Sequence, residues 1–230
     1  MDDPNKVYRL LIKFMDEKYV DSFLNDGLLY MNNIEFFRNY EDADVALRGD
    51  RHEGLSASLK SEDVIIKIGD RIIDGAVGKI DIRQSHEDET NIYSMTRISD
   101  GKILESGEEG LFLSSKFNKF GNKAVLICDI FEFERRLKLA ISQDERIYTA
   151  REDGIVARQV SYVSRDEHND QMDVFNKFDE YSWQYEWRIA FKQISGTGPL
   201  SLKIGRLADI AQVIETESLI SGPLELVPKN

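Results

Sequence analysis

The stretch Tyr181-Ser-Trp-Gln-Tyr-Glu-Trp-Arg-Ile-Ala-Phe191 alternates polar and apolar residues along its whole length. Successive side chains of a β-strand point to opposite faces of a sheet. One face would carry Ser182, Gln184, Glu186, Arg188 and Ala190, and the other Trp183, Tyr185, Trp187, Ile189 and Phe191. The pattern therefore predicts one long strand, with its aromatic face in a core and its polar side chains on the opposite face.

The segments around this strand predict further strands and a few short helices. Strands are expected at residues 7–14, 28–31, 91–98, 124–130, 154–163 and 199–204. Helices are expected at 17–25, with Gly27 as the stop, at 33–40 and at 131–142, and a short helix or turn is expected at 206–214. Between residues 63 and 83, the Gly-Asp and Asp-Gly dipeptides at 69–70 and 74–75 are typical of hairpins. Hairpins mixed with scattered helices favour an α+β fold with mostly antiparallel or mixed sheets, in a single domain over residues 1–230.

The composition indicates a folded chain without a membrane segment. The 230 residues include 12 Phe, 9 Tyr and 2 Trp, more aromatic residues than a disordered chain would carry. A net charge of −12 gives no general attraction to nucleic acid or anionic membranes. No apolar run approaches the roughly 20 residues of a membrane helix, and the acidic start Met1–Asn5 is unlike a signal peptide. We expect a cytoplasmic protein with no membrane partner.

Cysteine and histidine usage argues against disulfides and zinc. Cys128 is the single cysteine, which suits a reducing compartment, and its apolar neighbours predict a buried strand position with a structural role. His52, His86 and His168 lie far apart, and no Cys/His spacing resembles a zinc site. We therefore expect no metal site of this type.

Three further segments carry side chains suited to a ligand. The segment Arg48-Gly-Asp-Arg-His-Glu-Gly54 is expected to be an exposed loop, either simply solvated or holding phosphate oxygens through its arginines. Ser94 and Thr96 share one strand face, either as ordinary strand residues or offering hydroxyls to a ligand. Tyr8-Arg9, with Lys13, belongs to the opening strand, where an arginine between apolar neighbours must find an anion or reach solvent.

The polar face of the 181–191 segment has two interpretations. Glu186 and Arg188 would form an ordinary, weak pair on an exposed sheet face. Alternatively, the carboxylate of Glu186 and the amide of Gln184 are set on a rigid strand to hold a polyhydroxylated ligand.

Gln184-Tyr-Glu186 resembles the Gln/Glu-x-Glu signature of the ADP-ribosyltransferases. In that superfamily a basic residue on the first strand precedes a Ser/Thr strand and then the Gln/Glu-x-Glu strand, an order that Arg9, Ser94 with Thr96, and Gln184 with Glu186 follow. The chain also resembles an uncharacterised bacterial and phage family on the DarT-like side of the superfamily. Its Gly-x-Leu-Tyr strand corresponds to the segment that ends at Tyr30.

The resemblance implies a mono-ADP-ribosyltransferase that uses NAD as co-substrate, in a toxin or antiviral defence effector. It implies that Glu186 is the catalytic carboxylate on the ribose 2′-hydroxyl and that Gln184 orients the acceptor, a protein or nucleic acid. It also implies cofactor binding by the residues Arg9, Arg48, Ser94, Thr96 and Tyr30, with Arg9 or Arg48 on the pyrophosphate.

Two other classes of function stay open at this point. Asp50, Glu53 and Glu186 would provide the carboxylates of a metal-dependent hydrolase or nuclease, because such ligands suit magnesium. A small acidic protein of this kind would also act without catalysis, as a binding or inhibitor protein that occupies a partner's surface.

Overall fold

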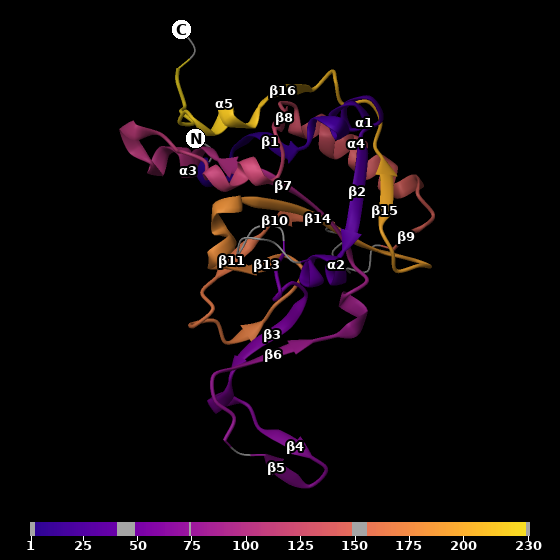
Figure 1. Ribbon diagram of the computed structural model, residues 1–230, viewed down its shortest axis with the longest axis vertical. Helices are drawn as coiled ribbons and strands as arrows, with labels where there is room; N and C mark the ends of the chain where they lie inside the picture. The colour runs from indigo at the N-terminus through magenta and orange to yellow at the C-terminus, as the bar shows by residue number, and fades with distance from the viewer. Residues whose placement is uncertain (1–2, 41–48, 74, 149–155, 229–230) are drawn as a thin grey trace.

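The computed structural model describes residues 3–40, 49–73, 75–148 and 156–228 (Figure 1). Its strands are β1 (Tyr8–Met15), β2 (Leu28–Asn33), β3 (Leu55–Lys60), β4 (Ile66–Ile68), β5 (Arg71–Ile73), β6 (Lys79–Arg83), β7 (Asn91–Ser99), β8 (Lys123–Ile127), β9 (Ile147–Tyr148), β10 (Ala157–Gln159), β11 (Ser161–Val163), β12 (Asp170–Gln171), β13 (Asn176–Phe178), β14 (Glu186–Gln193), β15 (Leu200–Lys203) and β16 (Ala211–Glu215).

The helices are short apart from α4. They are α1 (Val20–Asp26), α2 (Ile34–Asn39), α3 (Asp100–Glu105), α4 (Ile130–Gln143) and α5 (Thr216–Ile220), with 3₁₀ turns η1 (Pro4–Lys6), η2 (Glu17–Tyr19), η3 (Ser61–Asp63), η4 (Ser85–Glu87), η5 (Gly107–Glu109), η6 (Ser115–Lys119) and η7 (Asp179–Gln184). Most strand pairs are antiparallel, and β11 with β13 is parallel. The predicted α+β class with mostly antiparallel sheets is confirmed.

The central strand β7 has different partners along its two edges. On one edge it pairs with β14 over six consecutive residue pairs, from Asn91↔Phe191 to Thr96↔Glu186. On the other edge β1 pairs with the far end of β7, up to Ile12↔Thr96, and β2 pairs with its beginning, at Asn32↔Ile92. Residues 93–95 lie between these two partners. The sheet therefore divides into two branches, with β8 and β16 continuing beyond β1 and β15 continuing beyond β2.

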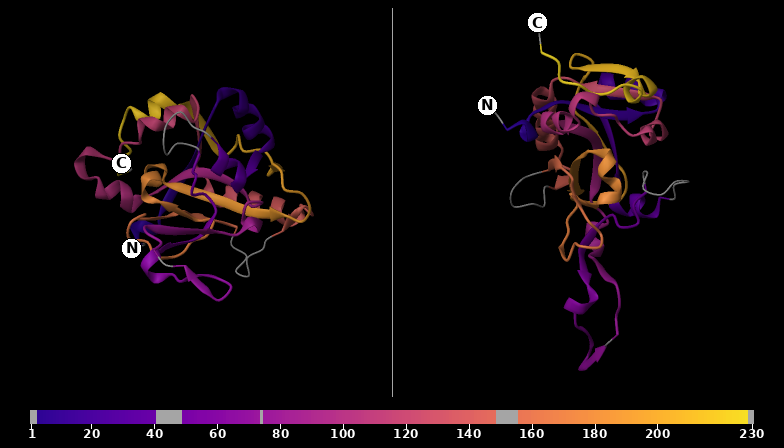
Figure 2. Two further views of the ribbon diagram at one scale, coloured as in Figure 1. Left: turned by 60° about the horizontal axis from the view of Figure 1, so that its bottom comes forward. Right: turned by 90° about the vertical axis from the view of Figure 1, so that its left-hand side faces the viewer.

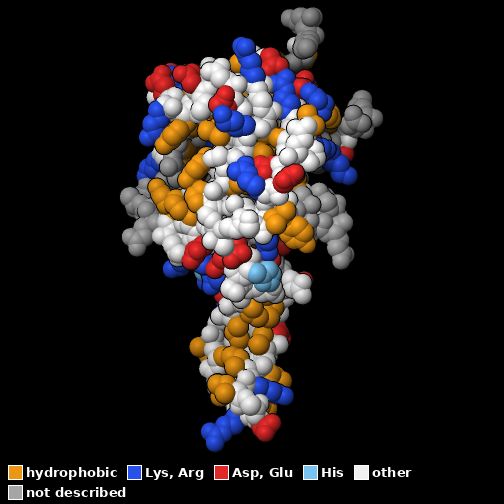
Figure 3. Space-filling view, turned by 90° about the vertical axis from the view of Figure 1, so that its right-hand side faces the viewer, with side chains coloured by type: hydrophobic (Ala, Val, Ile, Leu, Met, Phe, Trp, Pro, Cys, Tyr) orange, Lys and Arg blue, Asp and Glu red, His pale blue; other side chains and the backbone are white. Residues whose placement is uncertain are grey.

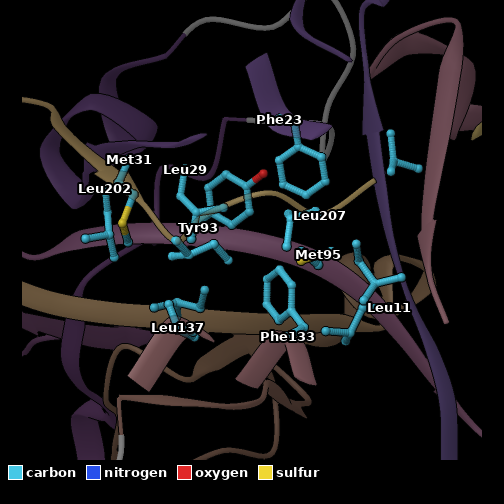
Figure 4. Packing of buried hydrophobic residues seen from close by; sticks show 14 of the residues in the cluster. Leu11, Phe23, Leu29, Met31, Tyr93, Met95, Phe133, Leu137, Leu202 and Leu207 are labelled. Carbon is cyan, nitrogen blue, oxygen red and sulfur yellow. The ribbon is translucent and has the colours of Figure 1, made fainter. Parts of the chain in front are cut away.

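The main core lies against the apolar face of β14 and β7. Trp187, Ile189 and Phe191 alternate along β14 and are buried with Tyr93 and Met95 of β7, as the period-two pattern predicted. Figure 4 shows side chains from β1, β2, β7, α1, α4 and β15 meeting in this cluster. Burial of this apolar surface is the main favourable term that holds the sheet together.

The segment 181–191 differs from the prediction in its first half. Residues 179–184 form the 3₁₀ turn η7, and Tyr185 follows with a left-handed backbone at φ 45°. The turn is fixed because the N–H of Tyr185 donates to the carbonyl of Ser182, while the N–H of Arg97 donates to the carbonyl of Tyr185. Trp183 and Tyr185 pack on a second cluster with Phe117. The predicted single strand with one shared aromatic face is therefore wrong before Glu186.

One further prediction is wrong, and another is right only in part. Cys128 is exposed, because β8 ends at Ile127 and the chain then turns toward α4. At residues 206–214, where a short helix or turn was expected, the chain makes a turn at 208–210, and β16 then begins at Ala211 and adds a strand to β8. The expected stop at Gly27 is confirmed, since this residue caps α1 with φ 60°.

An elongated arm leaves the rest of the molecule. β3, β6 and the short β12 form its base, and the β4–β5 hairpin lies at its far end (Figures 1 and 2). The predicted hairpin turn at Gly69-Asp70 is present, while Asp74 of the second predicted turn lies outside the described residues. Figure 3 shows hydrophobic side chains along the arm, and its exposed aliphatic residues include Ile65, Ile68, Ile72 and Val77.

None of the described helices has the length and hydrophobicity needed to cross a membrane.

Candidate functional site

A cavity of about 790 Å³ lies where the sheet divides between β1 and β2. This volume falls within the roughly 300–1,000 Å³ range of small-molecule sites. The end of β1, one side of β2 and residues 92–96 of β7 contribute to its wall. Many of its lining side chains are aromatic: Phe14, Tyr19, Phe23, Tyr30, Phe36, Phe37, Tyr40, Tyr93 and Phe120. Such a wall suits a ligand with planar rings.

Charged side chains of β14 form part of the cavity lining, and they are buried. Glu186 is 3% exposed and Arg188 1% exposed, so the interpretation as a solvent-exposed surface pair is wrong. One carboxylate oxygen of Glu186, Oε1, accepts hydrogen bonds from Ser94 Oγ at 2.5 Å and from Arg188 Nε at 2.7 Å. The register Arg188↔Ser94 puts this serine on the neighbouring strand, where it can fix the carboxylate.

Arg188 has a second carboxylate partner, which comes from a distant part of the chain. Its Nη1 and Nη2 donate to the two oxygens of Glu53 at 2.7 and 3.0 Å. Glu53 and Asp50 are both buried, so the predicted exposed loop is wrong for these two residues. The physical reason is that a buried guanidinium needs counter-charges, and burial without them is costly.

Lys177 of β13 completes the charged cluster, which we call the floor cluster and define as Glu53, Lys177, Gln184, Glu186 and Arg188. The Lys177 ammonium donates to Glu186 Oε2 at 3.1 Å and to Gln184 Oε1 at 3.2 Å. It also lies 3.9 Å from Glu53 Oε2. Every charge of this cluster therefore has an opposite charge in contact, as buried charges require.

Tyr185 lies between the two acceptors of the Lys177 ammonium and has a left-handed backbone. The residues 184–186 therefore do not form one continuous strand. Gln184 ends the turn η7, Tyr185 has φ 45°, and Glu186 begins β14. A non-glycine residue in this region costs of order 1–3 kcal/mol, and such residues cluster at functional sites. The strained residue Tyr185 therefore lies directly between Gln184 and Glu186, the two residues that bind Lys177.

Electrostatics keep Glu186 ionised. Burial opposes its ionisation, but Arg188 and Lys177 outweigh burial and hold the pKa of Glu186 well below its ordinary value. The carboxylates of Glu186 and Glu53 raise the pKa of Arg188, against the effect of burial. For Glu53, burial outweighs Arg188 and Lys177, and its pKa is raised. The site therefore contains one carboxylate that is strongly held as an anion.

Most of the residues singled out in the sequence meet in this cavity. Tyr30, Ser94, Thr96, Gln184 and Glu186 all line it. They come from β2, β7 and the η7–β14 junction, so the tertiary fold brings together segments about 60 and 90 residues apart. Thr96 Oγ1 donates to the main-chain carbonyl of Gln184 at 3.1 Å, which ties the last of these segments to β7.

One predicted cofactor residue, Arg9, is not part of the cavity lining. The Arg9 guanidinium pairs with the Asp100 carboxylate at 2.7 Å, and the Arg9 side chain is 64% exposed. Arg9 is not among the cavity residues. Its counter-charge, Asp100, directly follows β7 and lies beside the start of β1, so Arg9 is held at that end of the strand. Arg48 lies outside the described residues.

Lys13 occupies the position that the sequence suggested for Arg9. It lies on the same strand and lines the cavity. Its ammonium donates to the Ser94 carbonyl at 2.8 Å, in the part of β7 between β1 and β2, and lies 4.0 Å from the centre of the Tyr93 ring. Lys177 was missed altogether, because an isolated lysine in a short strand carries no sequence signal of burial.

The carboxylates proposed for a metal hydrolase have other partners. Glu53 and Glu186 both bind Arg188, and Asp50 accepts the N–H of His52 at 2.8 Å. Within the described part of the chain, no group of three or more His, Cys, Asp or Glu side chains is arranged to hold a metal ion.

Comparisons of this chain with protein-family models, with curated proteins and with solved structures find no match. The site is therefore characterised by its own geometry. It has a carboxylate held ionised by two cations, beside an aromatic cavity in a divided antiparallel sheet.

Proposed function

We propose that this protein is an NAD-dependent mono-ADP-ribosyltransferase whose catalytic carboxylate is Glu186. The observation that carries the proposal is the convergence of Tyr30, Ser94, Thr96, Gln184 and Glu186 on one cavity. These residues were selected from separate segments by their resemblance to one superfamily. The strands β14, β7 and β1 are consecutive neighbours in one sheet and carry the Glu186, Ser94/Thr96 and basic segments of the resemblance, which supports an ADP-ribosyltransferase-like fold.

The chemistry requires a fixed anion. In the transfer step the bond between the nicotinamide nitrogen and ribose C1′ breaks, and its electron pair leaves with nicotinamide. The ribose then resembles an oxocarbenium ion, and the acceptor atom bonds to C1′ and loses a proton. A preorganised carboxylate on the ribose 2′-hydroxyl stabilises this positive charge. Glu186 suits this role because Arg188 and Lys177 keep its pKa low, against the effect of burial.

The two oxygens of the Glu186 carboxylate have different hydrogen-bond partners. Ser94 holds Oε1, while Oε2 faces the Lys177 ammonium. We assign Oε2 to the ribose hydroxyl, since Oε1 already accepts from both Ser94 and Arg188, whereas Oε2 accepts from Lys177 alone among the described residues. Gln184 then lies next to the reacting centre, where it orients the acceptor, a protein or nucleic acid.

The rest of the cavity suits the remaining parts of NAD. Tyr30 and Phe36, which are both exposed, offer faces for planar rings. Lys13 and Lys18 also line the cavity and would attract the pyrophosphate. A toxin or antiviral defence role in the cytoplasm belongs to the same proposal.

The test is transfer of label from NAD. The purified protein is incubated with cell lysate and NAD labelled in its ADP-ribose part, and the labelled product is digested with nuclease or protease. We expect label in a macromolecule, and the digestion identifies its class. NAD and ADP-ribose should also raise the melting temperature, since a ligand that binds only the folded state stabilises it. If NAD gives neither transfer nor a higher melting temperature, the transferase proposal is wrong. The cavity would then bind a different ligand, and the binding-protein alternative would be favoured.

A further inference from the structure

Three arginines surround a buried histidine at the base of the arm. His52 lies in the turn before β3, Arg83 ends β6, and Arg165 follows β11. Arg51 Nε donates to His52 Nε2 at 3.2 Å, and Arg165 Nη1 contacts the same nitrogen. Arg83 Nη2 donates to the main-chain carbonyl of Arg51 at 2.8 Å. We call Arg51, Arg83 and Arg165 the arginine cluster.

His52 cannot satisfy this cluster. Its side chain is only 9% exposed, and because two donors face Nε2, the ring proton lies on Nδ1. Burial and the neighbouring arginines lower the pKa of His52 to about 4, so the ring is neutral at pH 7. A neutral imidazole nitrogen has one lone pair and accepts one well-aligned hydrogen bond. Two guanidiniums therefore compete for a single uncharged acceptor.

Few carboxylates contact the cluster directly in the described part of the chain, where Asp50 accepts from the His52 main-chain N–H and from none of the three guanidiniums. Asp81 Oδ2 lies 3.8 Å from Arg165 Nη2 and 3.5 Å from His52 Nδ1, while its Oδ1 accepts from Ser58. Asp88 uses both oxygens on Arg38. Among the described residues, no ion pair joins a carboxylate to Arg51 or Arg83. The three arginines therefore have one carboxylate, that of Asp81, within ion-pair distance among the residues that the structure describes.

We propose that the arginine cluster is a binding site for a phosphate group. Guanidinium groups match the oxygens of phosphate with paired, charge-assisted hydrogen bonds. A bound phosphate would supply the missing counter-charge and give both competing guanidiniums an anionic acceptor. The site is separate from the cavity lining, which contains none of these arginines. Phosphate binding at the arginine cluster does not depend on any reaction in the cavity. This proposal is therefore independent of the proposed transferase activity.

The histidines provide a direct readout. The chain has three, His52, His86 and His168, so their imidazole NMR signals can be assigned with His86→Gln and His168→Gln variants. Inorganic phosphate is titrated against the protein at constant ionic strength, with chloride as the reference anion. We expect a saturable shift of the His52 signals alone. The pKa of His52 should also rise, because a nearby anion favours the charged imidazolium.

Variants locate the site. Arg83→Gln and Arg165→Gln should each weaken phosphate binding by about tenfold or more, as the loss of a charge-assisted hydrogen bond implies. Arg135→Gln is the matched control, since Arg135 is an exposed arginine of α4 that pairs with Glu132. It should leave binding unchanged.

The source of the phosphate is decided by two further titrations, with ADP-ribose and with a short single-stranded oligonucleotide. The ligand that saturates at the lowest concentration identifies a nucleotide, a nucleic-acid backbone or free phosphate as the natural source. Unchanged His52 signals in phosphate, equal shifts at all three histidines, or full binding by Arg165→Gln would each overturn the proposal. The wild-type titration alone decides the first two outcomes, so the test does not depend on the folding of a variant.

Discussion

The Lys177 ammonium and the Glu186 carboxylate form an ion pair of 3.1 Å, and their side chains are 5% and 4% exposed. A buried ion pair adds little net stability to a fold, because its formation requires both charges to lose their water. Removing one partner is nevertheless strongly destabilising, because it leaves an uncompensated buried charge. The residue that we assign to catalysis therefore also has a structural role. Predictions about the two roles must be separated by experiment.

Replacing Glu186 by Gln should affect both roles. It removes the anion that stabilises the developing ribosyl cation, so transfer should fall by roughly a hundredfold or more. It also leaves Lys177 and Arg188 with Glu53 as their remaining carboxylate in the floor cluster, so the free energy of unfolding should fall by about 3–5 kcal/mol. Thermal unfolding and transfer from labelled NAD measure the two effects.

A core variant separates these effects. Leu137→Ala removes a buried side chain of α4 that is not part of the cavity and should cost about 2–5 kcal/mol. Per folded molecule it should transfer ADP-ribose normally. Equal activity of Glu186→Gln and Leu137→Ala would show that Glu186 is structural only.

Lys177→Met tests whether this lysine sets the charge state of Glu186. Burial opposes ionisation of Glu186, and Lys177 is one of the two cations that lower its pKa. Without this cation the pKa of Glu186 should rise, so the acid limb of the pH–activity profile should move to higher pH. An unchanged acid limb, in a variant that still folds, would mean that Lys177 does not control the carboxylate.

Lys13 and Arg9 make a matched pair of basic residues on β1. Lys13→Ala should weaken the stabilisation of the protein by NAD, because its ammonium lines the cavity. Arg9→Ala should leave that stabilisation by NAD intact, although it removes the partner of the buried Asp100 carboxylate and should lower the free energy of unfolding by about 1–3 kcal/mol. The melting temperature with increasing NAD distinguishes them. A larger effect of Arg9→Ala would restore Arg9 to the cofactor site.

The two tryptophans should differ in their contribution to stability. Trp187 is 1% exposed in the main core, and Trp187→Ala should cost about 3–5 kcal/mol. Trp183 is only partly buried, on the second cluster, so Trp183→Ala should cost clearly less. Urea unfolding of both variants gives the comparison. Equal losses would mean that Trp183 is packed as tightly as Trp187.

His52 should make stability depend on pH in a defined window. Burial and Arg165 lower its folded-state pKa from 6.5 to about 4, so between these values the unfolded chain binds more protons than the folded chain. Its contribution to stability is therefore present above pH 6.5 and is lost as the pH falls toward 4. A His52→Gln variant should show a flatter pH dependence in this window. A dependence as steep as that of the wild type would exclude His52 as its source.

Short-range pattern accounts for the parts of the fold that the sequence predicted. The alternation of residues 187–191 predicts a strand with a buried apolar face, since the period of a strand depends only on backbone geometry. Gly27 predicts the end of α1, because glycine adopts a left-handed backbone without steric cost. The convergence of Ser94, Gln184 and Glu186 was anticipated by resemblance, not by pattern.

Contacts between distant segments decided the rest. Glu53 and Arg188 are 135 residues apart, and only the folded chain shows that they neutralise each other in the interior. The pairing of Arg9 with Asp100 removed Arg9 from the site in the same way. Charged residues in a polar sequence pattern look solvent-exposed, because the free energy that allows their burial comes from partners elsewhere in the chain. The sequence alone thus determined the fold class and the apolar faces, whereas the tertiary structure decided which charges are buried together.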